Sequence, residues 1–279
     1  MLNFKVVDEL CTRCGLCVDD CPSRIIEQTG SQPPDIKKDK EAGCIGCQHC
    51  LAVCPTAAIS IHGKNPADSI PITSDKLPGF EKMNMLIRSR RSIRHYKDQN
   101  VDPALISKLL ATVSNAPSGV NSRKLTFRVI DDKAAMKRFR ERVLSGLKAA
   151  DAAGKIPANF SYLMAAVPAY YEKKIDLIFR NAPHALIVSA SPDAACPTED
   201  VPIALAYFEL LAQSAGLGTV WWGMLKMALI ALPELKPVLG IPDGHTYYAM
   251  LFGVPDIQFA RTVQRDAAAK VRRIEIPAV

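Results

Sequence analysis

Residues 11–22 read CTRCGLCVDDCP, and residues 44–55 read CIGCQHCLAVCP. Both stretches follow the pattern C-x2-C-x2-C-x3-C-P, and each cysteine of the first returns 33 positions later in the second. The echo continues beyond the thiols, because Ser23 and Ile26 return as Thr56 and Ile59. The first part of the chain is therefore an internal repeat built around closely spaced cysteines, and it takes up all but one of the nine in the chain.

This spacing is that of bacterial two-cluster ferredoxins, in which the fourth cysteine of each run binds the cluster of the other run. The pattern predicts two [4Fe-4S] clusters with an exchanged fourth ligand. The ligands of the first cluster are predicted to be Cys11, Cys14, Cys17 and Cys54. Those of the second are predicted to be Cys44, Cys47, Cys50 and Cys21.

Two other uses of cysteine fit the pattern less well. A structural zinc ion takes four ligands, often as two separated C-x2-C pairs, and does not need a third cysteine or a trailing Cys-Pro. A disulfide framework suits short secreted chains, and no charged and apolar leader precedes Cys11. The repeated spacing favours iron–sulfur clusters over both.

The length of 279 residues leaves room for about two domains. We expect a ferredoxin-type domain over residues 1–62, whose small core depends on its clusters for folding free energy. Residues 63–80, rich in proline and glycine, are expected to form an extended linker. Residues 81–279 are long enough to bury a core of their own.

Charge is divided unevenly along the chain. Residues 1–66 have a formal charge of −1, and residues 67–279 carry +8. A basic surplus can indicate nucleic acid, but no zinc finger, basic helix or aromatic RNA-binding motif accompanies it. It favours an anionic cofactor and an acidic redox partner instead. We therefore expect no nucleic-acid partner.

No apolar stretch approaches the 20 or so residues of a membrane span, so we expect no membrane partner. We expect a cytoplasmic location.

Beyond the linker the sequence predicts an α+β fold. Asp102 and Pro103 mark a helix start, and the helix should end by Asn115. Further helices are expected over 134–150 and 200–216, the latter opened by Asp200 and Pro202 and capped by Gly216. Strands are expected over 125–130, 185–190 and 247–252. No G-x-G-x-x-G follows a strand, so a nicotinamide-binding Rossmann domain is not indicated.

Four segments of the larger part could contribute to a binding site. Residues 88–96, RSRRSIRHY, could clamp a phosphate, although a solvated basic face is the commoner meaning of such a run. Residues 116–123, APSGVNSR, offer amides at a loop, or form an ordinary helix-to-strand turn. Residues 216–223, GLGTVWWG, let backbone approach a planar ligand, or simply cap a helix before aromatic core, which is the role we expect for both tryptophans. The basic tail adds Arg261 and Arg265.

In this order and spacing, the four segments resemble the FMN-dependent nitroreductase family across residues 81–279. The resemblance implies a mixed sheet flanked by helices and a homodimer with FMN at its interface. Its implied phosphate and ribitol ligands are Arg90, Arg91, Ser92, Arg94 and, from the tail, Arg261. Its implied contacts along the isoalloxazine are Pro117, Ser118, Gly119, Asn121 and Gly223. Trp222 stands where relatives often have an acid, and 123–125 read RKL in place of Gln-Pro-Trp.

The whole chain resembles ferredoxin–nitroreductase fusions. The resemblance implies an oxidoreductase in which electrons from the clusters, from an external ferredoxin or from NAD(P)H reach FMN. The flavin then reduces a small electrophilic acceptor such as a nitroaromatic or quinone, and no acid–base pair in the sequence marks a catalytic residue. The alternative is an electron-transfer module that serves a protein partner and has no dedicated small substrate.

Other reactive side chains are expected to be structural. Cys196 belongs to neither motif and is expected to be an inert thiol. His49 lies within the second motif, whose ligand set is already complete, so it is expected to influence a cluster only indirectly. His184 and His245 adjoin apolar strands and are expected to support the fold.

Overall fold

A computed structural model describes residues 2–265 and 269–277. The chain divides into two compact units. The first contains the cysteine repeat up to Pro78 together with Pro117–Lys124 and Asp193–Pro197. The second contains Gly79–Ala116, Leu125–Pro192 and the chain from Thr198 onward. The boundaries of the ferredoxin-type domain and linker, at residues 62 and 80, stay a prediction.

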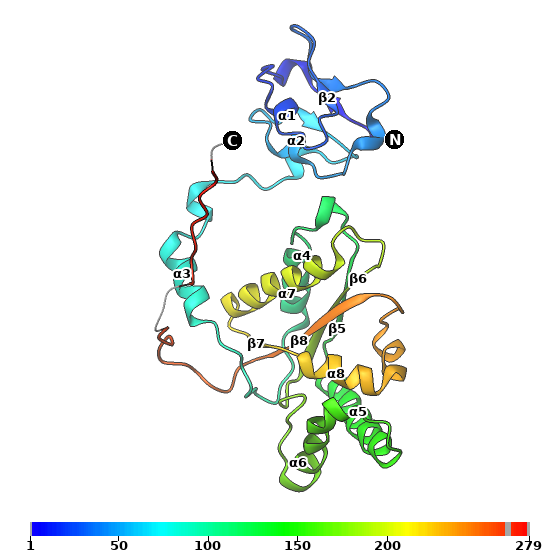
Figure 1. Cartoon of the computed structure of the whole chain (residues 1–279). Helices are drawn as coiled ribbons and strands as arrows, with labels where there is room; N and C mark the ends of the chain where they lie inside the picture. Colours follow the sequence, from blue (N-terminus) through cyan, green and yellow to red (C-terminus); the bar gives the residue numbers. More distant parts are fainter. Residues whose placement is uncertain (1, 266–268, 278–279) are drawn as a thin grey trace. The chain divides into compact units, whose positions relative to one another are not determined.

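The first unit is built from short elements around the cysteines (Figure 1). Strand β1 (Lys5–Val6) pairs with β4 (Ile59–Ser60), and β2 (Ile26–Glu27) pairs with β3 (Asp35–Ile36), both antiparallel. Single-turn helices α1 (Leu16–Asp19) and α2 (His49–Ala52) each contain the third cysteine of a motif. Apolar side chains from both halves pack together with buried Cys17 and Cys50, so the core of this unit includes the thiols themselves.

The backbone repeats with the same period as the sequence. Left-handed φ angles recur 33 residues apart in a series of pairs: Arg13 (57°) and Gly46 (66°), Gly15 (76°) and Gln48 (62°), Arg24 (50°) and Ala57 (55°), Gly30 (58°) and Gly63 (71°). Left-handed backbone is costly for residues other than glycine and occurs mainly in tight turns. At these four positions the two halves therefore turn in the same way, even where only one of them has glycine.

The second unit is organised on a four-stranded sheet in the order β5-β6-β8-β7. Its strands are β5 (Leu125–Ile130), β6 (His184–Ala190), β7 (Gly218–Trp221) and β8 (Thr246–Gly253), and neighbouring strands pair antiparallel. A parallel bridge between Ser92 and Thr219 adds the preceding arginine-rich segment beside β7. All seven residues of β6 are buried, which is the pattern of a strand covered on both faces.

Helices cover the two faces of this sheet (Figure 1). Apolar residues of α5 (Lys133–Ala152), α6 (Ala166–Lys173) and α8 (Gly223–Ala231) form one core with Ile187 and Leu251. On the other side Phe208 of α7 (Pro197–Ser214) packs edge-on against Phe252 of β8. Helix α4 (Pro103–Val113) adds a buried apolar stripe, and α3 (Phe80–Ser89) has no buried residue.

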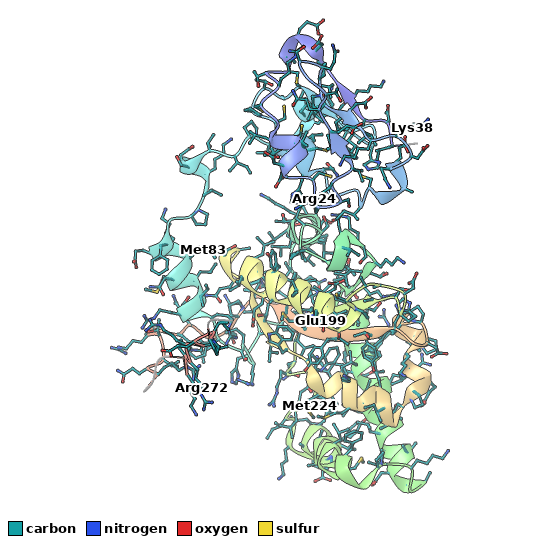
Figure 2. The ribbon with its side chains drawn as sticks, turned by 45° about the horizontal axis from the view of Figure 1, so that its top comes forward. Arg24, Lys38, Met83, Glu199, Met224 and Arg272 are labelled. Carbon is teal, nitrogen blue, oxygen red and sulfur yellow. The ribbon has the colours of Figure 1, made fainter. Side chains whose placement is uncertain are left out.

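The α+β class is confirmed, and so are the strands and most of the helix positions. Asp102 caps α4 by accepting a hydrogen bond from the Ala104 amide at 2.9 Å. The predicted start of α7 was wrong: the helix begins at Pro197, and Pro202 lies inside it. Proline suits a first helical position, and an interior proline near the N-terminus removes only one backbone hydrogen bond. Glu199 lies in the first turn of α7 (Figure 2), where a negative charge complements the helix dipole.

Strand β7, inside the glycine- and tryptophan-rich stretch 216–223, and helix α8, which begins at its last residue, were not predicted. Within residues 63–80, the predicted linker, the chain forms short 3-10 turns at Pro66–Asp68 and Ser74–Lys76, in keeping with its many prolines. Among the described residues, no helix combines the length and apolar character that crossing a membrane requires.

Candidate functional site

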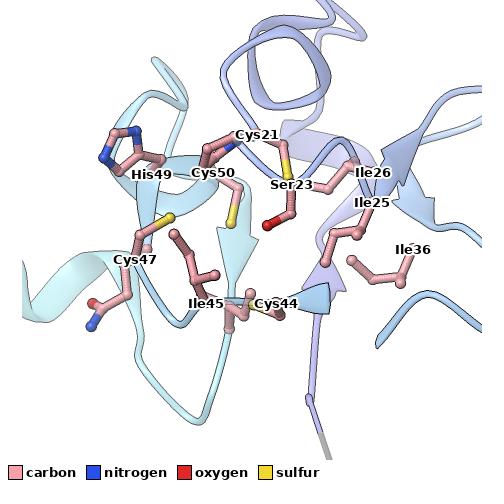
Figure 3. A pocket seen from close by; sticks show the side chains of 13 residues that line it. Cys21, Ser23, Ile25, Ile26, Ile36, Cys44, Ile45, Cys47, His49 and Cys50 are labelled. Atoms are coloured by element: carbon pink, nitrogen blue, oxygen red, sulfur yellow. The ribbon is translucent and has the colours of Figure 1, made fainter. Parts of the chain in front are cut away.

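The eight motif cysteines line two separate cavities in the first unit. One cavity is lined by Cys21, Cys44, Cys47 and Cys50, with Ile25, Ile26 and Ile36 on its walls. Figure 3 shows these cysteine side chains around one space. The other cavity is lined by Cys11, Cys14, Cys17 and Cys54. The cavity of Cys11, Cys14, Cys17 and Cys54 is called the first cavity below, and the cavity of Cys21, Cys44, Cys47 and Cys50 is called the second cavity. Each cavity takes three cysteines from one motif and the fourth from the other.

The donor set suits a cluster better than a single ion. Among the described residues, no three His, Cys, Asp or Glu side chains lie close enough to hold one metal ion, whereas the corners of a cubane lie further apart. Burial raises the pKa of the Cys50 thiol to about 11 and also raises the pKa of Cys17. Thiols of this kind are deprotonated only when a cation compensates the charge, which a cluster does.

The thiol of Cys54 lies in a different environment. Burial alone would raise its pKa, but hydrogen bonds from the Ala58 amide and from Thr56 outweigh this effect, so the pKa is lowered. The Ala58 nitrogen lies 3.3 Å from the Cys54 sulfur. The first cavity therefore contains a sulfur that is already stabilised as thiolate by its own repeat.

The loop 117–124 packs within the first unit. Gly119 lies against Cys196, because a Cβ atom at Gly119 would come within 2.7 Å of its sulfur. Ser118 Oγ accepts a hydrogen bond from the Arg123 amide at 3.0 Å. Asn121 donates its side-chain amide to the Ile45 carbonyl at 2.9 Å. The contact of Asn121 is thus with a loop of the cysteine repeat, and the flavin role that the resemblance assigns to 117–121 remains an expectation.

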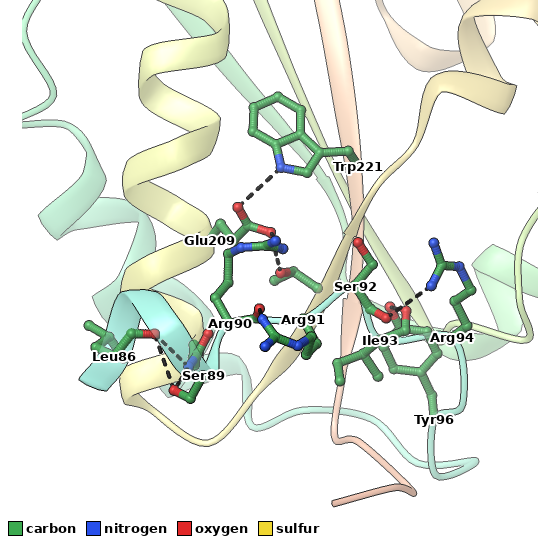
Figure 4. Close-up of polar contacts among 12 residues, drawn as sticks. Leu86, Ser89, Arg90, Arg91, Ser92, Ile93, Arg94, Tyr96, Glu209 and Trp221 are labelled. Atoms are coloured by element: carbon green, nitrogen blue, oxygen red, sulfur yellow. Dashed lines mark hydrogen bonds and ion pairs between the residues drawn. The ribbon is translucent and has the colours of Figure 1, made fainter. Parts of the chain in front are cut away.

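In the second unit, the arginine-rich segment runs beside β7. The Ile93 amide donates to the Thr219 carbonyl at 2.8 Å, which fixes residues 90–94 as extended chain. Side chains of extended chain alternate between two faces. Arg91 and Ile93 line a cavity of about 330 Å³ with Gly216, Gly218 and Thr219 among its other residues. Arg90, Ser92 and Arg94 are not part of this lining and point to the other side (Figure 4).

Glu209 is a functional candidate that sequence reasoning missed. Its side chain is only 8% exposed and pairs with Arg90 Nη1 at 3.0 Å. The same carboxylate accepts hydrogen bonds from Trp221 Nε1 at 3.1 Å and from Thr219 Oγ1 at 3.5 Å (Figure 4). A buried carboxylate needs such partners to stay ionised. The sequence did contain a signal for it, because Glu209 is an acidic residue on the apolar face of the helix predicted over 200–216.

The guanidinium of Arg91 is in the opposite situation. Its Nη1 donates to the Arg90 carbonyl. Its Nε and Nη2 are buried and have no hydrogen-bond partner among the described residues. Leaving buried donors of a charged group unpaired is costly, typically about 1–3 kcal/mol or more. A phosphate within reach of these nitrogens would satisfy them and compensate the charge, and the Arg91 side chain lines the cavity described above.

The remaining predicted residues lie apart from these contacts. Gly223 begins α8, and a Cβ atom there would meet the Tyr248 hydroxyl at 2.9 Å. Arg261 is exposed beyond β8. The core role of Trp222 is confirmed, since it is 2% exposed and donates to the Ile178 carbonyl at 2.9 Å. Trp221 is only partly buried and binds Glu209 instead.

The histidines have structural surroundings. His184 is fully buried, and its Nε2 accepts the Val101 amide at 2.8 Å. Burial lowers the pKa of His184, so it is neutral near pH 7. His245 Nδ1 lies 3.3 Å from Ser189 Oγ. His49 Nδ1 lies 3.1 Å from Asp20 Oδ2, which joins the two cysteine motifs at their surface.

Gly218 should be intolerant of a larger side chain. A Cβ atom there would lie 2.6 Å from Ile93 Cγ1, so Gly218→Ala should push residues 90–94 away from β7. We expect a loss of about 1–3 kcal/mol in the free energy of unfolding, as for other overpacked sites. Urea unfolding followed by tryptophan fluorescence measures this.

Gly79→Ala is the matched control, because its added methyl group meets nothing within 4 Å. The second substitution Ile93→Ala in the Gly218→Ala chain should recover part of the loss. Equal stability of the two glycine variants would contradict the tight packing of Ile93 on β7.

Comparison with known families agrees with this arrangement. Residues 87–254, well over half of the chain, match the family model described as "Nitroreductase family". The chain belongs to the nitroreductase family. Residues 10–58 match the model of the 4Fe-4S dicluster domain, so a cluster-type domain precedes the nitroreductase domain.

Named relatives match one part or the other. The chain is 30% identical to "FMN reductase [NAD(P)H]" of Bacillus subtilis over 58% of this chain and 66% of the relative, just under two thirds of its length. It is 25% identical to a "Putative NADH dehydrogenase/NAD(P)H nitroreductase" of Archaeoglobus fulgidus, over 62% of this chain and 84% of the relative. A "Ferredoxin-like protein in nif region" of Sinorhizobium fredii is 43% identical over 19% of this chain and 88% of its own length.

Solved structures share the fold of the nitroreductase domain. A nitroreductase with bound FMN from Bacteroides fragilis superposes with a TM-score of 0.56 at 18% identity, covering 70% of this chain and 99% of that one. A nitroreductase with bound FMN from Desulfitobacterium hafniense gives 0.54 at 21% identity, covering 71% and 100%. These similarities confirm the nitroreductase fold.

Proposed function

We propose that this chain is an iron–sulfur flavoprotein in which two [4Fe-4S] clusters deliver electrons to FMN, which reduces a small electrophilic acceptor. The observation that carries the proposal is the two cysteine-lined cavities in a chain whose larger part belongs to the nitroreductase family. Clusters transfer single electrons, and a flavin accumulates two and passes them on together.

The cavities support the crossed assignment of ligands. The first cluster would be held by Cys11, Cys14, Cys17 and Cys54, and the second by Cys44, Cys47, Cys50 and Cys21. The exchanged ligands, Cys21 and Cys54, tie each half of the repeat to the cluster of the other half.

Arg91 supports a phosphate-bearing cofactor in the second unit. Two of its nitrogens have no partner within residues 2–265 and 269–277. Its side chain lines a cavity whose size is within the range of about 300–1,000 Å³ found for cofactor sites. Ser92 and Arg94 offer further donors on the neighbouring face, and Glu209 holds Arg90 in place. For Gly223 and Arg261 the assignment as FMN contacts rests on the family resemblance, as it does for Pro117, Ser118, Gly119 and Asn121.

A homodimer is part of this proposal. Helix α3 exposes Phe80, Met85 and Ile87, and the extended tail exposes Ile274 and Ile276. Apolar side chains gathered on an unburied helix are typical of an interface. A second copy of the chain would cover them.

The acceptor belongs to the class of nitroaromatics and quinones, and the donor is NAD(P)H or a reduced external ferredoxin. The Bacillus subtilis relative, named as an NAD(P)H-dependent FMN reductase, supports a nicotinamide donor. A cytoplasmic location is part of the proposal because low-potential clusters suit a reducing compartment.

The second candidate function is an electron-transfer module that serves a protein partner. The surplus of basic residues in the larger part of the chain favours it, because such a surface attracts an acidic protein.

The test is electron transfer within the anaerobic full-length protein. Protein reduced at the clusters by a limited amount of dithionite should pass electrons to FMN, and a nitroaromatic or quinone should then reoxidise both. Stopped-flow absorbance follows the cluster and flavin bands separately. Variants without clusters should lose turnover with reduced ferredoxin by orders of magnitude, while turnover with NAD(P)H measures the independent flavin route.

Full turnover of the cluster-free variants with every donor would contradict the relay. Reoxidation by a protein partner but by none of the small acceptors would favour the electron-transfer module. Cluster and flavin content are measured in each sample, so that loss of a cofactor is distinguished from loss of transfer.

A further inference from the structure

Two side chains from outside the cysteine motifs contact the loop 44–47 of the second cavity. His62 Nε2 lies 3.5 Å from the sulfur of Cys44. Asn121 donates its amide to the Ile45 carbonyl at 2.9 Å. Gly46 lies between them, since a Cβ atom there would be 3.9 Å from both the His62 ring and the Asn121 amide. All these residues belong to the first unit.

A tight turn positions His62. Ile61 and Lys64 exchange both backbone hydrogen bonds, at 3.3 and 2.8 Å. His62 and Gly63 between them have φ angles of 54° and 71°, as in the two-residue hairpin turns of type I′. The His62 amide also donates to the Leu2 carbonyl at 3.0 Å. The ring is therefore held beside Cys44 by the backbone on either side of it.

The internal repeat provides a built-in comparison. The positions 33 residues before His62 and Gly63 are Thr29 and Gly30, and Gly30 has the same left-handed φ. Thr29 has no nitrogen in its side chain to offer a sulfur. The two halves share the left-handed glycine but not the turn, because Thr29 lacks the left-handed φ of His62 and the first half is closed by the Gln32 amide donating to the Thr29 carbonyl. The imidazole therefore occurs at this position in the second half alone.

The loop of the first cavity is closed in another way. Arg13 takes the position of Gly46 and has the same left-handed backbone. Its guanidinium donates to the Cys11 carbonyl and to the Ser31 carbonyl, each at 2.7 Å. The first loop is held by its own side chain, whereas the second leaves space at glycine for His62 and Asn121.

The contact of His62 has a defined direction when a cluster is bound. An iron-bound thiolate can only accept a hydrogen bond, so Nε2–H of His62 donates to Cys44. Hydrogen bonds to ligand sulfurs are among the factors that set the reduction potential of a cluster, because they stabilise the more negative, reduced form.

We propose that His62 raises the reduction potential of the second cluster through this N–H···S bond, with Asn121 holding the loop that presents Cys44. The inference rests on the proposed assignment of the second cluster to Cys21, Cys44, Cys47 and Cys50. It makes the two halves of the repeat electrochemically different although their ligands are the same. His62 acts on the cluster through the sulfur of Cys44 and does not itself bind iron.

The test is an anaerobic redox titration of the full-length protein followed by electron paramagnetic resonance. In His62→Leu, one of the two cluster midpoint potentials should fall and the other should stay. His62→Gln, which keeps a side-chain N–H at a similar reach, should restore most of the difference. Thr29→Val, at the equivalent position of the first half, should leave both potentials unchanged.

Unchanged potentials in His62→Leu, with iron and sulfide at wild-type content, would overturn the inference. An equal fall in the Leu and Gln variants would also overturn it, because the imidazole bulk and not the hydrogen bond would then be responsible. Protein that contains neither iron nor sulfide would overturn the proposed function itself, and this inference with it.

If His62→Leu does not assemble the second cluster, a second measurement decides. Wild-type protein labelled with ¹⁵N-histidine should show a nitrogen coupling to one reduced cluster in pulsed electron paramagnetic resonance. The coupling should be absent from labelled His62→Gln, which retains His49. No difference between these two spectra would overturn the inference.

Discussion

Cys54→Ala should remove the cluster of the first cavity, although Cys54 belongs to the second motif. Its sulfur shares that cavity with Cys11, Cys14 and Cys17, and a cubane with three protein ligands is easily lost. Iron and sulfide should fall from about eight per chain to about four, as expected for two four-iron clusters reduced to one. Chemical analysis of anaerobically purified protein gives these contents.

Cys21→Ala is the reciprocal variant and should remove the cluster of the second cavity. Cys196→Ala is the matched control, since this ninth cysteine lines neither cavity. To identify the cluster lost, each variant is combined with His62→Leu, which should shift the remaining potential only in Cys54→Ala. The opposite pattern would mean that each motif keeps its own fourth cysteine.

The double substitution Arg90→Ala and Arg91→Ala should weaken FMN binding by about 10²–10⁴-fold. Each charge-assisted contact with the cofactor, to the phosphate from Arg91 and on the neighbouring face from Arg90, contributes on the order of 1.5–3 kcal/mol, and about 1.4 kcal/mol corresponds to a tenfold change. Titration of the flavin-free protein with FMN, followed by the quenching of flavin fluorescence, measures the dissociation constant. An unchanged dissociation constant would mean that residues 88–96 are a solvated basic face and do not bind FMN.

The single substitutions should separate the two arginines. Arg91→Ala should reduce FMN affinity with little loss of stability, because its Nε and Nη2 have no partner among the described residues. Arg90→Ala should also destabilise the fold, because it leaves Glu209 buried and charged without its cation. Adding Glu209→Gln to Arg90→Ala should recover stability but not affinity, and recovery of both would show that Arg90 acts through the fold alone.

The cofactor-binding motifs were the easiest features to predict from the sequence. Cysteine spacing is set by the geometry of the cluster, so the pattern carries over directly to the two cavities. Strands β5, β6 and β8 were predictable because their apolar runs are bounded by turn residues. Helix α4 was predictable because Asp102 and Pro103 form a strong local start signal.

Features that depend on distant pairing could not be predicted in this way. Strand β7 begins at a glycine and forms because β8 and residues 92–93 supply its partners. Arg90 and Glu209 are 119 residues apart, and no local pattern links them. The division of Arg90 and Arg91 between two faces follows only once their segment is known to be extended beside Thr219.

The helix α7 shows how a local signal can be placed wrongly. Asp200 and Pro202 are typical of a helix start, and the chain offers a second such start at Pro197. The helix begins at the earlier one, which makes the buried Asp200 and Val201 part of its first turns. Helices that start at Pro197 or at Asp200 differ too little in intrinsic free energy for the sequence alone to show which start is used.

The unequal closure of the two cysteine loops has a consequence for dissecting this protein. Arg13 closes the first loop with partners that all lie within the first 31 residues, so a fragment ending near Pro78 keeps every one of them. The same fragment lacks Asn121 and therefore the contact to Ile45. Spectra of an excised ferredoxin fragment should reproduce the intact enzyme for one cluster and misrepresent it for the other.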